Sequence, residues 1–423
     1  MPPTAALLAA AGCRLARRGS RRLTRRCCST QAAAALAPSF TATLNYTTAD
    51  IIQLAQTDEA AAVQAFWQPL HDYRALMHGL GVRHAREELK LGDGSEFVAS
   101  LATESAEQRK ARLASFNAFL EALKARGDPD AAAVEAARRR SGGAHRQAVR
   151  VEVRDARHEL SSEATLDATG FCLERLDATA LYGATDAATA QARYQRAMQA
   201  LVRARTGASR VFCSPAKVRR TDGGQQAAVA GHAQRPLHGV HNDFGPTFAS
   251  ELVRGLQAHE ESVAADAALP GPSLQAVTVG LCKQLRAAGV TAAELQASRV
   301  LMVNTWRSLH AAPVRRQPLA LVDRRSVAAE DVAVIPMPAG VTSEFAVRLV
   351  YARPSAAHAW YWFSSMTPEE VLLFKQYDSA EPESCGMLHS AVHHPGTTPD
   401  SPPRHSYEMR MLCLLPGEKE AET

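Results

Sequence analysis

Hydrophobic and polar residues alternate in several short stretches, most of them after residue 145. The clearest is 149–153, where apolar and charged side chains take turns as in a strand with one buried face. Further strands are predicted at residues 41–48, 169–173, 209–213, 299–306, 332–335, 345–351, 358–363 and 409–415. Short strands separated by turn-forming residues favour a β-barrel or jelly roll.

Helical periodicity is concentrated in the N-terminal part of the chain. Residues 52–140 are rich in Ala, Glu and Arg, and Phe116, Phe119, Leu120 and Leu123 recur at the spacing of one helix face. A Ser-Gly-Gly sequence follows this block and ends it. More helices are predicted at residues 186–206, 248–258 and 273–288. We therefore expect a mainly β protein with added α structure, in which helices and an Ala-rich helical insertion decorate the β core.

The first 49 residues differ in charge from the rest, because they contain seven arginines and no acidic residue. A segment rich in Arg and Ser and free of acids is typical of an organelle transit peptide. We expect residues 1–40 to direct the protein to the mitochondrion, or as a second choice to a plastid. If this segment is not a transit peptide, we expect a cytoplasmic protein. The predicted organisation continues with a short β segment and helical insertion at 41–140, a jelly-roll domain at 141–417 and a loose tail at 418–423.

Composition excludes several classes of protein. Of the 423 residues, 46% are hydrophobic and 22% are charged, which is typical of a globular protein. The net charge of +5 comes from the N-terminal arginines, so we expect no nucleic-acid partner. No run of about 18 apolar residues occurs, so we expect no membrane span. The eight cysteines form no C-x-x-C pair, which argues against a zinc knuckle or a disulfide framework.

A His-x-Asp pair, His241 and Asp243, is the strongest candidate for chemistry. On a strand, residues two apart point to the same face, so the imidazole and the carboxylate converge. With one more histidine, such a pair makes the facial triad of non-haem Fe(II) enzymes. The candidates for the third ligand are His310, His358, His389, His393, His394 and His405. We prefer His389, which lies 148 residues after His241 and near the start of the last strands.

Arg404 and Ser406 are candidates for binding a co-substrate. An oxygenase that uses 2-oxoglutarate needs a cation for the distal carboxylate, and the planar fork of arginine grips a carboxylate with two hydrogen bonds. A hydroxyl can add a third, and on a strand Arg404 and Ser406 share a face. Arg410 and Arg307 are the rival anchors.

Several segments, in the same order along the chain, resemble the AsaB/CmcJ-like hydroxylase/desaturase family, which includes a fungal gibberellin desaturase. The longest runs from Asn304 to Val332 and begins NTWRSL. The others are TATLNY at 41–46, VRDAR at 153–157, TGFCLERLDATA at 169–180, TGASRVF at 206–212, VHNDF at 240–244, WYWFSSMTPEEVLLFKQYDS at 360–379, LHSAV at 388–392 and PPRHSYEMR at 402–410. Together these segments span residues 41–50 and 145–415.

The resemblance implies a double-stranded β-helix (jelly-roll) fold with Fe(II) held by His241, Asp243 and His389. It also implies 2-oxoglutarate as co-substrate, with Arg404 and Ser406 as its carboxylate site, and a small organic molecule and O2 as the other reactants. Hydroxylation or desaturation is the implied reaction. Candidates for contacting substrate or supporting the ligands are Asn304, Arg307, Lys375 and Arg410.

This sequence departs from the family pattern at three positions. Ser308 and Leu388 stand where proline is usual, and Ala359 replaces a common arginine next to His358. None of these changes removes a metal ligand, although Ala359 puts contacts to substrate in doubt. Two other functions fit the same residues. One is a metal-dependent hydrolase, which has no need of the Arg404 and Ser406 pair, and the other is a non-catalytic jelly-roll binding protein.

Overall fold

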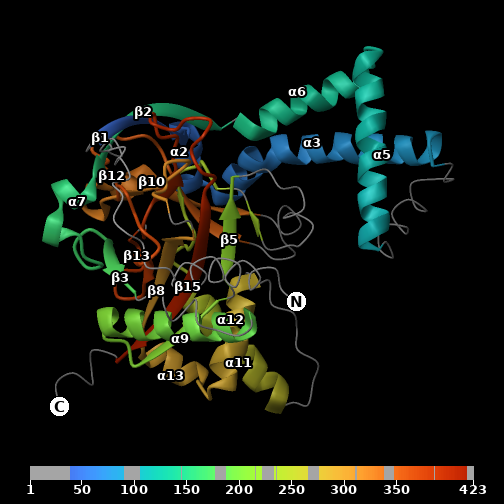
Figure 1. Ribbon diagram of the computed structural model, residues 1–423. Helices are drawn as coiled ribbons and strands as arrows, with labels where there is room; N and C mark the ends of the chain where they lie inside the picture. Colours follow the sequence, from blue (N-terminus) through green and yellow to red (C-terminus); the bar gives the residue numbers. More distant parts are fainter. Residues whose placement is uncertain are drawn as a thin grey trace, which may run out of the picture. The chain divides into compact units, whose positions relative to one another are not determined.

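The computed structural model describes residues 39–89, 105–143, 145–176, 187–214, 216–221, 233–234, 236–264, 276–309, 312–337, 347–384 and 386–416 (Figure 1). Contacts divide the chain into two units, Met1–Ile52 with Ala148–Thr423 and Gln53–Gln147. Each unit has its own hydrophobic core. His310, the predicted tail and all but the last two residues of the predicted transit peptide lie outside the described residues.

An eight-stranded sheet has the order β1-β2-β12-β9-β14-β7-β11-β10. Its strands are β1 Ser39–Thr47, β2 Arg146–Asp155, β7 His241–Asn242, β9 Leu319–Val322, β10 Val332–Met337, β11 Val347–Ala352, β12 Trp360–Trp362 and β14 His389–Ala391. The short strands β7 and β14 are direct neighbours, and His241 pairs with His389 in their antiparallel register. Segments almost 150 residues apart in sequence therefore meet in the middle of this sheet.

A seven-stranded sheet has the order β3-β13-β8-β15-β5-β6, with β4 also paired to β15. Its strands are β3 Phe171–Arg175, β4 Arg210–Cys213, β5 Lys217–Arg220, β6 Ala233–Gln234, β8 Arg299–Ser308, β13 Glu370–Asp378 and β15 His405–Leu415. Its long central strands β8 and β15 run antiparallel over ten residue pairs, from Ser406 with Ser308 to Leu415 with Arg299.

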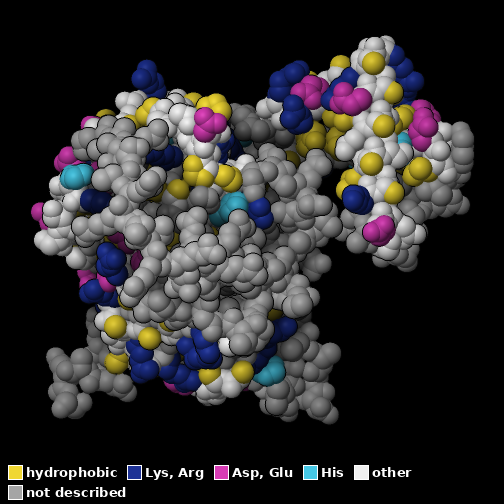
Figure 2. All heavy atoms as spheres, viewed as in Figure 1, with side chains coloured by type: hydrophobic (Ala, Val, Ile, Leu, Met, Phe, Trp, Pro, Cys, Tyr) yellow, Lys and Arg dark blue, Asp and Glu magenta, His cyan; other side chains and the backbone are white. Residues whose placement is uncertain are grey.

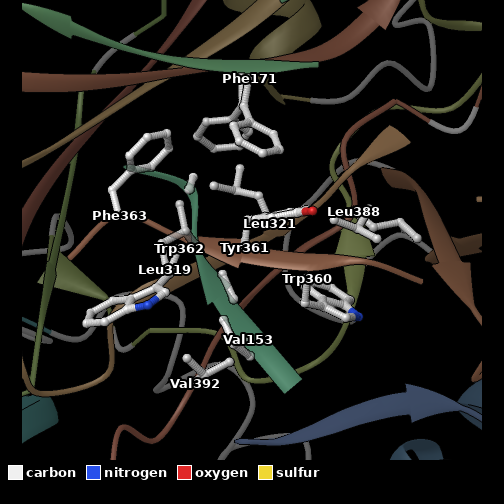
Figure 3. Close-up of a cluster of buried hydrophobic side chains, with 14 of the residues drawn as sticks. Val153, Phe171, Leu319, Leu321, Trp360, Tyr361, Trp362, Phe363, Leu388 and Val392 are labelled. Carbon is white, nitrogen blue, oxygen red and sulfur yellow. The ribbon is translucent and has the colours of Figure 1, made fainter. Parts of the chain in front are cut away.

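The two sheets face each other across the largest core cluster. Alternate residues of the seven-stranded sheet point into it, such as Trp306 of β8 and Phe374 of β13, and they join Leu321 and Trp360 of the eight-stranded sheet in one cluster. Figure 3 shows Leu321 and Trp360 in this cluster. Trp306, Trp360 and Trp362 are all buried in this cluster, as expected from core packing. Two mostly antiparallel sheets around one core form a jelly roll, which confirms the predicted fold class.

The outer face of the seven-stranded sheet is covered by helix α9, Ala187–Thr206. Tyr194, Met198 and Val202 recur every four residues and pack on the sheet. Exposed arginines occupy the other side of the helix, and basic side chains are visible over it in Figure 2. Helices α11 Phe248–Ala264, α12 Ala276–Ala287 and α13 Ala292–Ala297 bury a further apolar cluster against the ends of β8 and β15.

Short helical segments join the strands of this unit. They are α7 Ala156–Glu159 and the 3-10 turns η1 Ser161–Glu163, η2 Arg324–Ser326 and η3 Ala329–Asp331. Helix α2, Ala49–Thr57, follows β1 and contains the boundary between the two units. Within the described residues, no helix combines the length and the apolar character needed to cross a membrane.

The unit Gln53–Gln147 is helical, with α3 Glu59–Glu87, α5 Ala106–Ala125 and α6 Pro129–Gly143. Its core contains Phe116, Phe119 and Leu123, three of the residues whose spacing indicated a helix. A capping box begins α5, because the Ser105 hydroxyl accepts from the Gln108 backbone and the Gln108 side chain accepts from the Ser105 backbone. The domain boundary predicted at 140/141 stays a prediction.

Most strands lie where a strand was predicted, but the sequence analysis did not predict the short strands β5, β6, β9 and β14 or the longer β13. All nine of its residues are buried, so neither face carries the exposed polar residues that reveal a half-buried strand. The stretch predicted at 41–48 is β1, which begins at Ser39 and places Phe40 in the core.

Candidate metal centre

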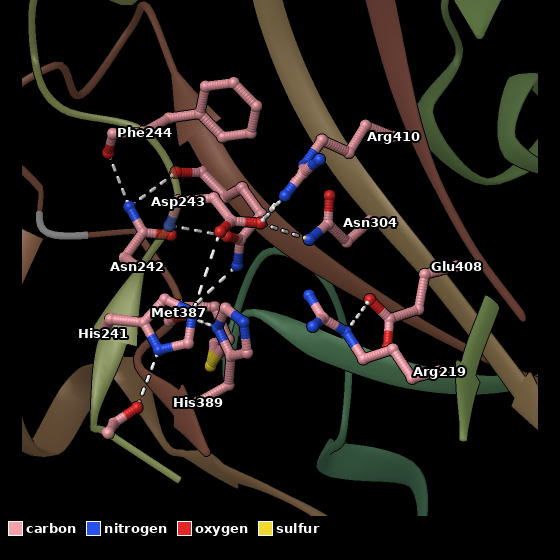
Figure 4. A network of polar contacts seen from close by, with 12 residues as sticks. Arg219, His241, Asn242, Asp243, Phe244, Asn304, Met387, His389, Glu408 and Arg410 are labelled. Carbon is pink, nitrogen blue, oxygen red and sulfur yellow. Dashed lines mark hydrogen bonds and ion pairs between the residues drawn. The ribbon is translucent and has the colours of Figure 1, made fainter. Parts of the chain in front are cut away.

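His241, Asp243 and His389 come together between the two sheets. One ligand atom from each residue lies within 4.8 Å of the others (Figure 4). The imidazoles come from the paired strands β7 and β14, with ring centroids 4.4 Å apart. Asp243 follows the end of β7, so a strand of only two residues still presents both members of the His-x-Asp pair on one side. Among the candidate histidines that the structure describes, His389, which we preferred, is therefore the one that joins the pair.

Both imidazoles are held in the form that binds a metal. Nδ1 of His241 lies 2.7 Å from the Gly239 carbonyl oxygen, and Nδ1 of His389 lies 3.0 Å from that of Met387. A carbonyl oxygen only accepts, so each Nδ1 carries the hydrogen and each Nε2 keeps its lone pair. Burial lowers the pKa of His241 and that of His389, the latter to about 4, so both rings are neutral near pH 7.

One oxygen of Asp243 is engaged by the seven-stranded sheet. Oδ2 accepts from Arg410 Nη2 at 2.6 Å and Nε at 3.2 Å, and from Asn304 Nδ2 at 3.2 Å. The other oxygen, Oδ1, lies 3.7 Å from Nε2 of His241. Two of the four residues predicted to contact substrate or support the ligands, Asn304 and Arg410, thus orient the carboxylate so that Oδ1 faces the histidines.

The loop that carries Asp243 is fastened to β13 by Gln376, which sequence reasoning did not identify. Its Oε1 accepts from the Asp243 backbone N–H at 3.0 Å, and its carbonyl oxygen accepts from Asn242 Nδ2 at 3.0 Å. Gly386, at φ +65°, lies against these same groups, and a Cβ there would collide with the Gln376 carbonyl oxygen. Only glycine tolerates both that φ and that approach.

The donor set fits a divalent iron. Two neutral imidazoles and one carboxylate on one side of a site, with the other side open, make the 2-His-1-carboxylate arrangement of Fe(II) oxygenases. The hydrogen bonds at Nδ1 and Oδ2 are the supporting contacts that orient such ligands. His241 Nε2, Asp243 Oδ1 and His389 Nε2 would hold the metal.

A cavity of about 20 Å³ adjoins the three residues, which is room for about one water-sized group. The residues that line it come from both sheets: Arg219, Leu237, His241, Asp243, Asn304, Trp306, Leu319, Phe374, His389, Ala391, Arg404 and Glu408. Arg404, the predicted carboxylate anchor, therefore faces the same space as the histidines. Polar and charged groups converge here against an apolar wall of Leu319 and Phe374.

Arg404 is 2% exposed, and each of its three guanidinium nitrogens has a partner. Nε donates to Ser406 Oγ at 3.1 Å, Nη1 to the Gln317 carbonyl oxygen at 2.7 Å and Nη2 to Glu408 Oε1 at 3.3 Å. Burial lowers the pKa of Arg404 to about 10, so it stays charged near pH 7. Ser406, the predicted second member of the carboxylate site, is thus in contact with the anchor.

Glu408 and Arg219 complete the charged groups of the cavity, and sequence reasoning missed both. Glu408 Oε2 accepts from Arg219 Nε at 2.8 Å. Burial raises the pKa of Glu408, but Arg219 and Arg404 outweigh this effect and lower it overall, so the carboxylate is ionised. The alternation Arg404, Ser406, Glu408, Arg410 along β15 was available as a signal for Glu408, whereas nothing around Arg219 singles it out.

The other two predicted candidates lie away from the cavity. Arg307 is on the opposite face of β8, where its guanidinium lies over the Tyr194 ring at 5.5 Å. Lys375 is buried and pairs with Asp378 at 3.0 Å.

The rival histidines also have other contacts. His358 lies 3.3 Å from Asp331 and hydrogen-bonds to Tyr46. His393 stacks on His238, and His394 lies against Phe40 and Trp362. His405 points to neither imidazole, because the residues of β15 that face the cavity are the even-numbered ones.

Comparison with known proteins connects this site to a family. Residues 119–270 and 276–414 match the family model described as "Oxidoreductase/YMDC permease-like domain". The chain is similar to the gibberellin cluster GA4 desaturase of Gibberella fujikuroi, with 28% identity over 44% of this chain and 52% of that protein. It is similar to an Fe(II)/2-oxoglutarate-dependent dioxygenase of Aspergillus novofumigatus, with 29% identity over 55% of this chain and 70% of that protein.

A hydroxylase/desaturase of Hormonema carpetanum is 36% identical over 29% of this chain and 43% of its own length. The matches thus span about half the length of these relatives. Among solved structures, the chain is similar to the iron and alpha-ketoglutarate-dependent endoperoxidase NvfI, with a TM-score of 0.49 and 25% identity over 64% of this chain and 87% of that one.

Proposed function

The chain belongs to the family described as "Oxidoreductase/YMDC permease-like domain", and from this premise we propose that it is a non-haem Fe(II)/2-oxoglutarate-dependent oxygenase. Its substrate is a small organic metabolite, which it hydroxylates or desaturates. One observation carries the proposal: a two-histidine, one-carboxylate cluster shares a cavity with a buried, charged arginine. The relatives named desaturase, dioxygenase and hydroxylase/desaturase agree with this chemistry.

Each residue of the site has a role in this proposal. His241, Asp243 and His389 hold Fe(II), while Arg410 and Asn304 fix the orientation of Asp243 through its Oδ2. Arg404, with Ser406, binds the distal carboxylate of 2-oxoglutarate. When bound together, Fe(II), 2-oxoglutarate and O2 supply the oxidative chemistry, which couples decarboxylation of the keto acid to oxidation of a substrate C–H bond. Leu319 and Phe374 keep water from that side of the cavity.

The alternative functions draw less support. A metal-dependent hydrolase would use the same ligands but has no role for a buried arginine that offers its guanidinium beside them. A non-catalytic binding protein has no need of three intact ligands with oriented lone pairs. The relatives reported above carry names of oxidative enzymes.

An anaerobic titration tests the proposal. The protein is loaded with Fe(II), and 2-oxoglutarate is added while the visible metal-to-ligand charge-transfer band is followed. We expect one Fe(II) per chain and a band that saturates with the keto acid. The Asp243→Ala variant, which lacks the carboxylate ligand, should show neither. If the wild-type protein binds Fe(II) but gives no band with 2-oxoglutarate, the oxygenase proposal is wrong.

We further propose that the segment predicted as residues 1–40 acts as an organelle transit peptide, with the mitochondrion as first choice and a plastid as second, and that the removed part ends before Ser39, where β1 begins. Seven arginines and no acid in this stretch support the proposal.

A further inference from the structure

Glu408 occupies a position that has no part in holding the metal. Residues 404, 406, 408 and 410 follow one another on the inner side of β15, because alternate residues of a strand share a face. Glu408 is the acid of this row and lies between Arg404 and Arg410. Figure 4 shows its carboxylate directed at the Arg219 guanidinium.

The Glu408 carboxylate bridges two arginines. Oε2 lies 2.8 Å from Arg219 Nε and Oε1 lies 3.3 Å from Arg404 Nη2. The other two partners of Arg404 are a hydroxyl and a backbone carbonyl oxygen, so among the described residues Glu408 supplies the one anion that hydrogen-bonds to Arg404. A side-chain carboxylate is chemically the same group as the distal carboxylate of a dicarboxylic keto acid. The contact at 3.3 Å is also the longest of the three.

The free space beside Arg404 is small, so groups around it must move when 2-oxoglutarate binds. The cavity measures about 20 Å³, which holds about one water-sized group and not a five-carbon dicarboxylate. Arg404 is buried, and its hydrogen bonds to Ser406, Gln317 and Glu408 use three of its five N–H donors, with at least one on each nitrogen. An incoming carboxylate that binds through two parallel hydrogen bonds must therefore compete with at least one of these partners. Gln317 contacts Arg404 through its backbone carbonyl oxygen, and Ser406 through a hydroxyl on a short side chain. Glu408 has the longer, rotatable side chain and a second arginine to retain it.

We propose that Glu408 is an internal competitor of the co-substrate: its carboxylate occupies Arg404 until the distal carboxylate of 2-oxoglutarate displaces it toward Arg219. This inference rests on the proposed function. Glu408 neutralises a buried guanidinium while no keto acid is bound, since an unpaired buried charge is strongly unfavourable. The same contact sets the affinity for 2-oxoglutarate, because every binding event must break it. Glu408 is thus a specificity-determining residue for dicarboxylic keto acids.

The test compares two keto acids with Fe(II)-loaded protein under anaerobic conditions, using the charge-transfer band to measure Kd. 2-Oxoglutarate has a distal carboxylate, whereas pyruvate chelates iron through the same keto-acid group without one. In Glu408→Gln the amide is a weaker partner for Arg404, because its neutral oxygen lacks the charge that attracts the guanidinium. We expect Kd for 2-oxoglutarate to fall by about tenfold, while Kd for pyruvate changes by less than about twofold.

Two further variants keep the test decisive. Glu408→Asp retains the charge but withdraws the carboxylate from Arg404, so it should also strengthen 2-oxoglutarate binding selectively. Glu370→Gln is the matched control, since Glu370 is a buried acid paired with Arg157 at 2.8 Å on β13 and does not line the cavity. It should leave both Kd values unchanged.

The outcomes separate the two proposals. If wild-type protein gives no band with 2-oxoglutarate, the proposed function fails and the inference fails with it. If wild-type protein gives the band but both Glu408 variants bind 2-oxoglutarate equally or more weakly, with one Fe(II) still bound, the inference alone is wrong. An equal fall in Kd for pyruvate also overturns the inference. The tighter binding would then come from the changed charge near the iron and not from lost competition at Arg404.

Discussion

Arg410 donates two hydrogen bonds to a single oxygen of Asp243, from Nη2 at 2.6 Å and from Nε at 3.2 Å. The two residues come from different sheets, so this contact ties the metal-binding loop after β7 to the central strand β15. It also decides which carboxylate oxygen is turned toward His241 and His389. Arg410 therefore binds the metal ligand Asp243, and Arg404 is the better-supported anchor for a co-substrate.

We predict that Arg410→Lys weakens Fe(II) binding about 10- to 100-fold, the range typical for losing a contact that orients a metal ligand. Lysine keeps the charge but cannot direct two hydrogen bonds at one oxygen from a planar fork. The measurement is an anaerobic Fe(II) titration. Arg307→Lys is the control, because Arg307 lies on the opposite face of the same sheet. Equal iron affinity in both variants would contradict the role given to Arg410.

The choice of the third ligand is tested by two alanine substitutions. His389→Ala should abolish stoichiometric Fe(II) binding, because a ligand atom of His389 lies within 4.8 Å of those of His241 and Asp243. His393→Ala should retain it, because His393 stacks on His238. Metal content after gel filtration measures both. Loss of iron in the His393 variant with retention in the His389 variant would reverse the assignment.

The alternation of apolar and polar residues predicted strands that have one buried and one exposed face. It did not predict strands that are buried on both faces or that are very short. Strand β13 is buried on both faces, and its polar residues are paired inside: Lys375 with Asp378, and Gln376 with the backbone of Asp243. In the sequence they interrupt an apolar run and hide the strand. β7 and β14 have two and three residues, too few to show any period.

The metal ligands were predictable because His-x-Asp and a downstream histidine are chemically distinctive, whereas their supporting contacts were not. The alternating polar residues of β15, such as Ser406 and Glu408, are typical of a solvent-exposed strand face, yet they lie on the side of the cavity. The apolar residues between them, Tyr407, Met409 and Met411, pack under α9. Glu408 and Arg219 form their pair across 189 residues of sequence, and only the fold brings them together.

The transit-peptide proposal predicts a shortened mature chain. Because β1 begins at Ser39 and Phe40 is buried in the core, we expect cleavage before Ser39. N-terminal sequencing of the protein purified from its native source measures this. A mature protein that starts at Met1 or Pro2 would show that the segment is retained.

Arg404→Lys should weaken 2-oxoglutarate binding about ten- to hundredfold, since losing a charge-assisted contact costs about 1.5–3 kcal/mol. Fe(II) binding should be preserved, because no ligand is altered. The anaerobic charge-transfer titration gives both values. Arg307→Lys serves again as the control, and weaker keto-acid binding in that variant alone would move the anchor away from Arg404.

Acid should remove a defined part of the stability through Asp378. Burial opposes ionisation of this carboxyl, but hydrogen bonds from Arg299 and Lys375 outweigh it and lower its pKa from 3.8 to about 2. The folded state therefore binds this proton less readily than the unfolded state. The resulting stabilisation, about 2 kcal/mol, is fully present above about pH 4 and is lost as the pH falls toward 2.

Chemical unfolding of wild type and Asp378→Asn, followed by the fluorescence of the buried Trp306, Trp360 and Trp362, measures this effect. We expect the difference in free energy of unfolding between the two proteins to be constant from pH 7 to about pH 5 and to shrink below pH 4. Glu294→Gln, which removes an exposed pair with Arg210, should change stability by less than about 1 kcal/mol at any pH. A difference for Asp378→Asn that does not change between pH 5 and pH 3 would mean that the carboxyl is not held ionised by Arg299 and Lys375.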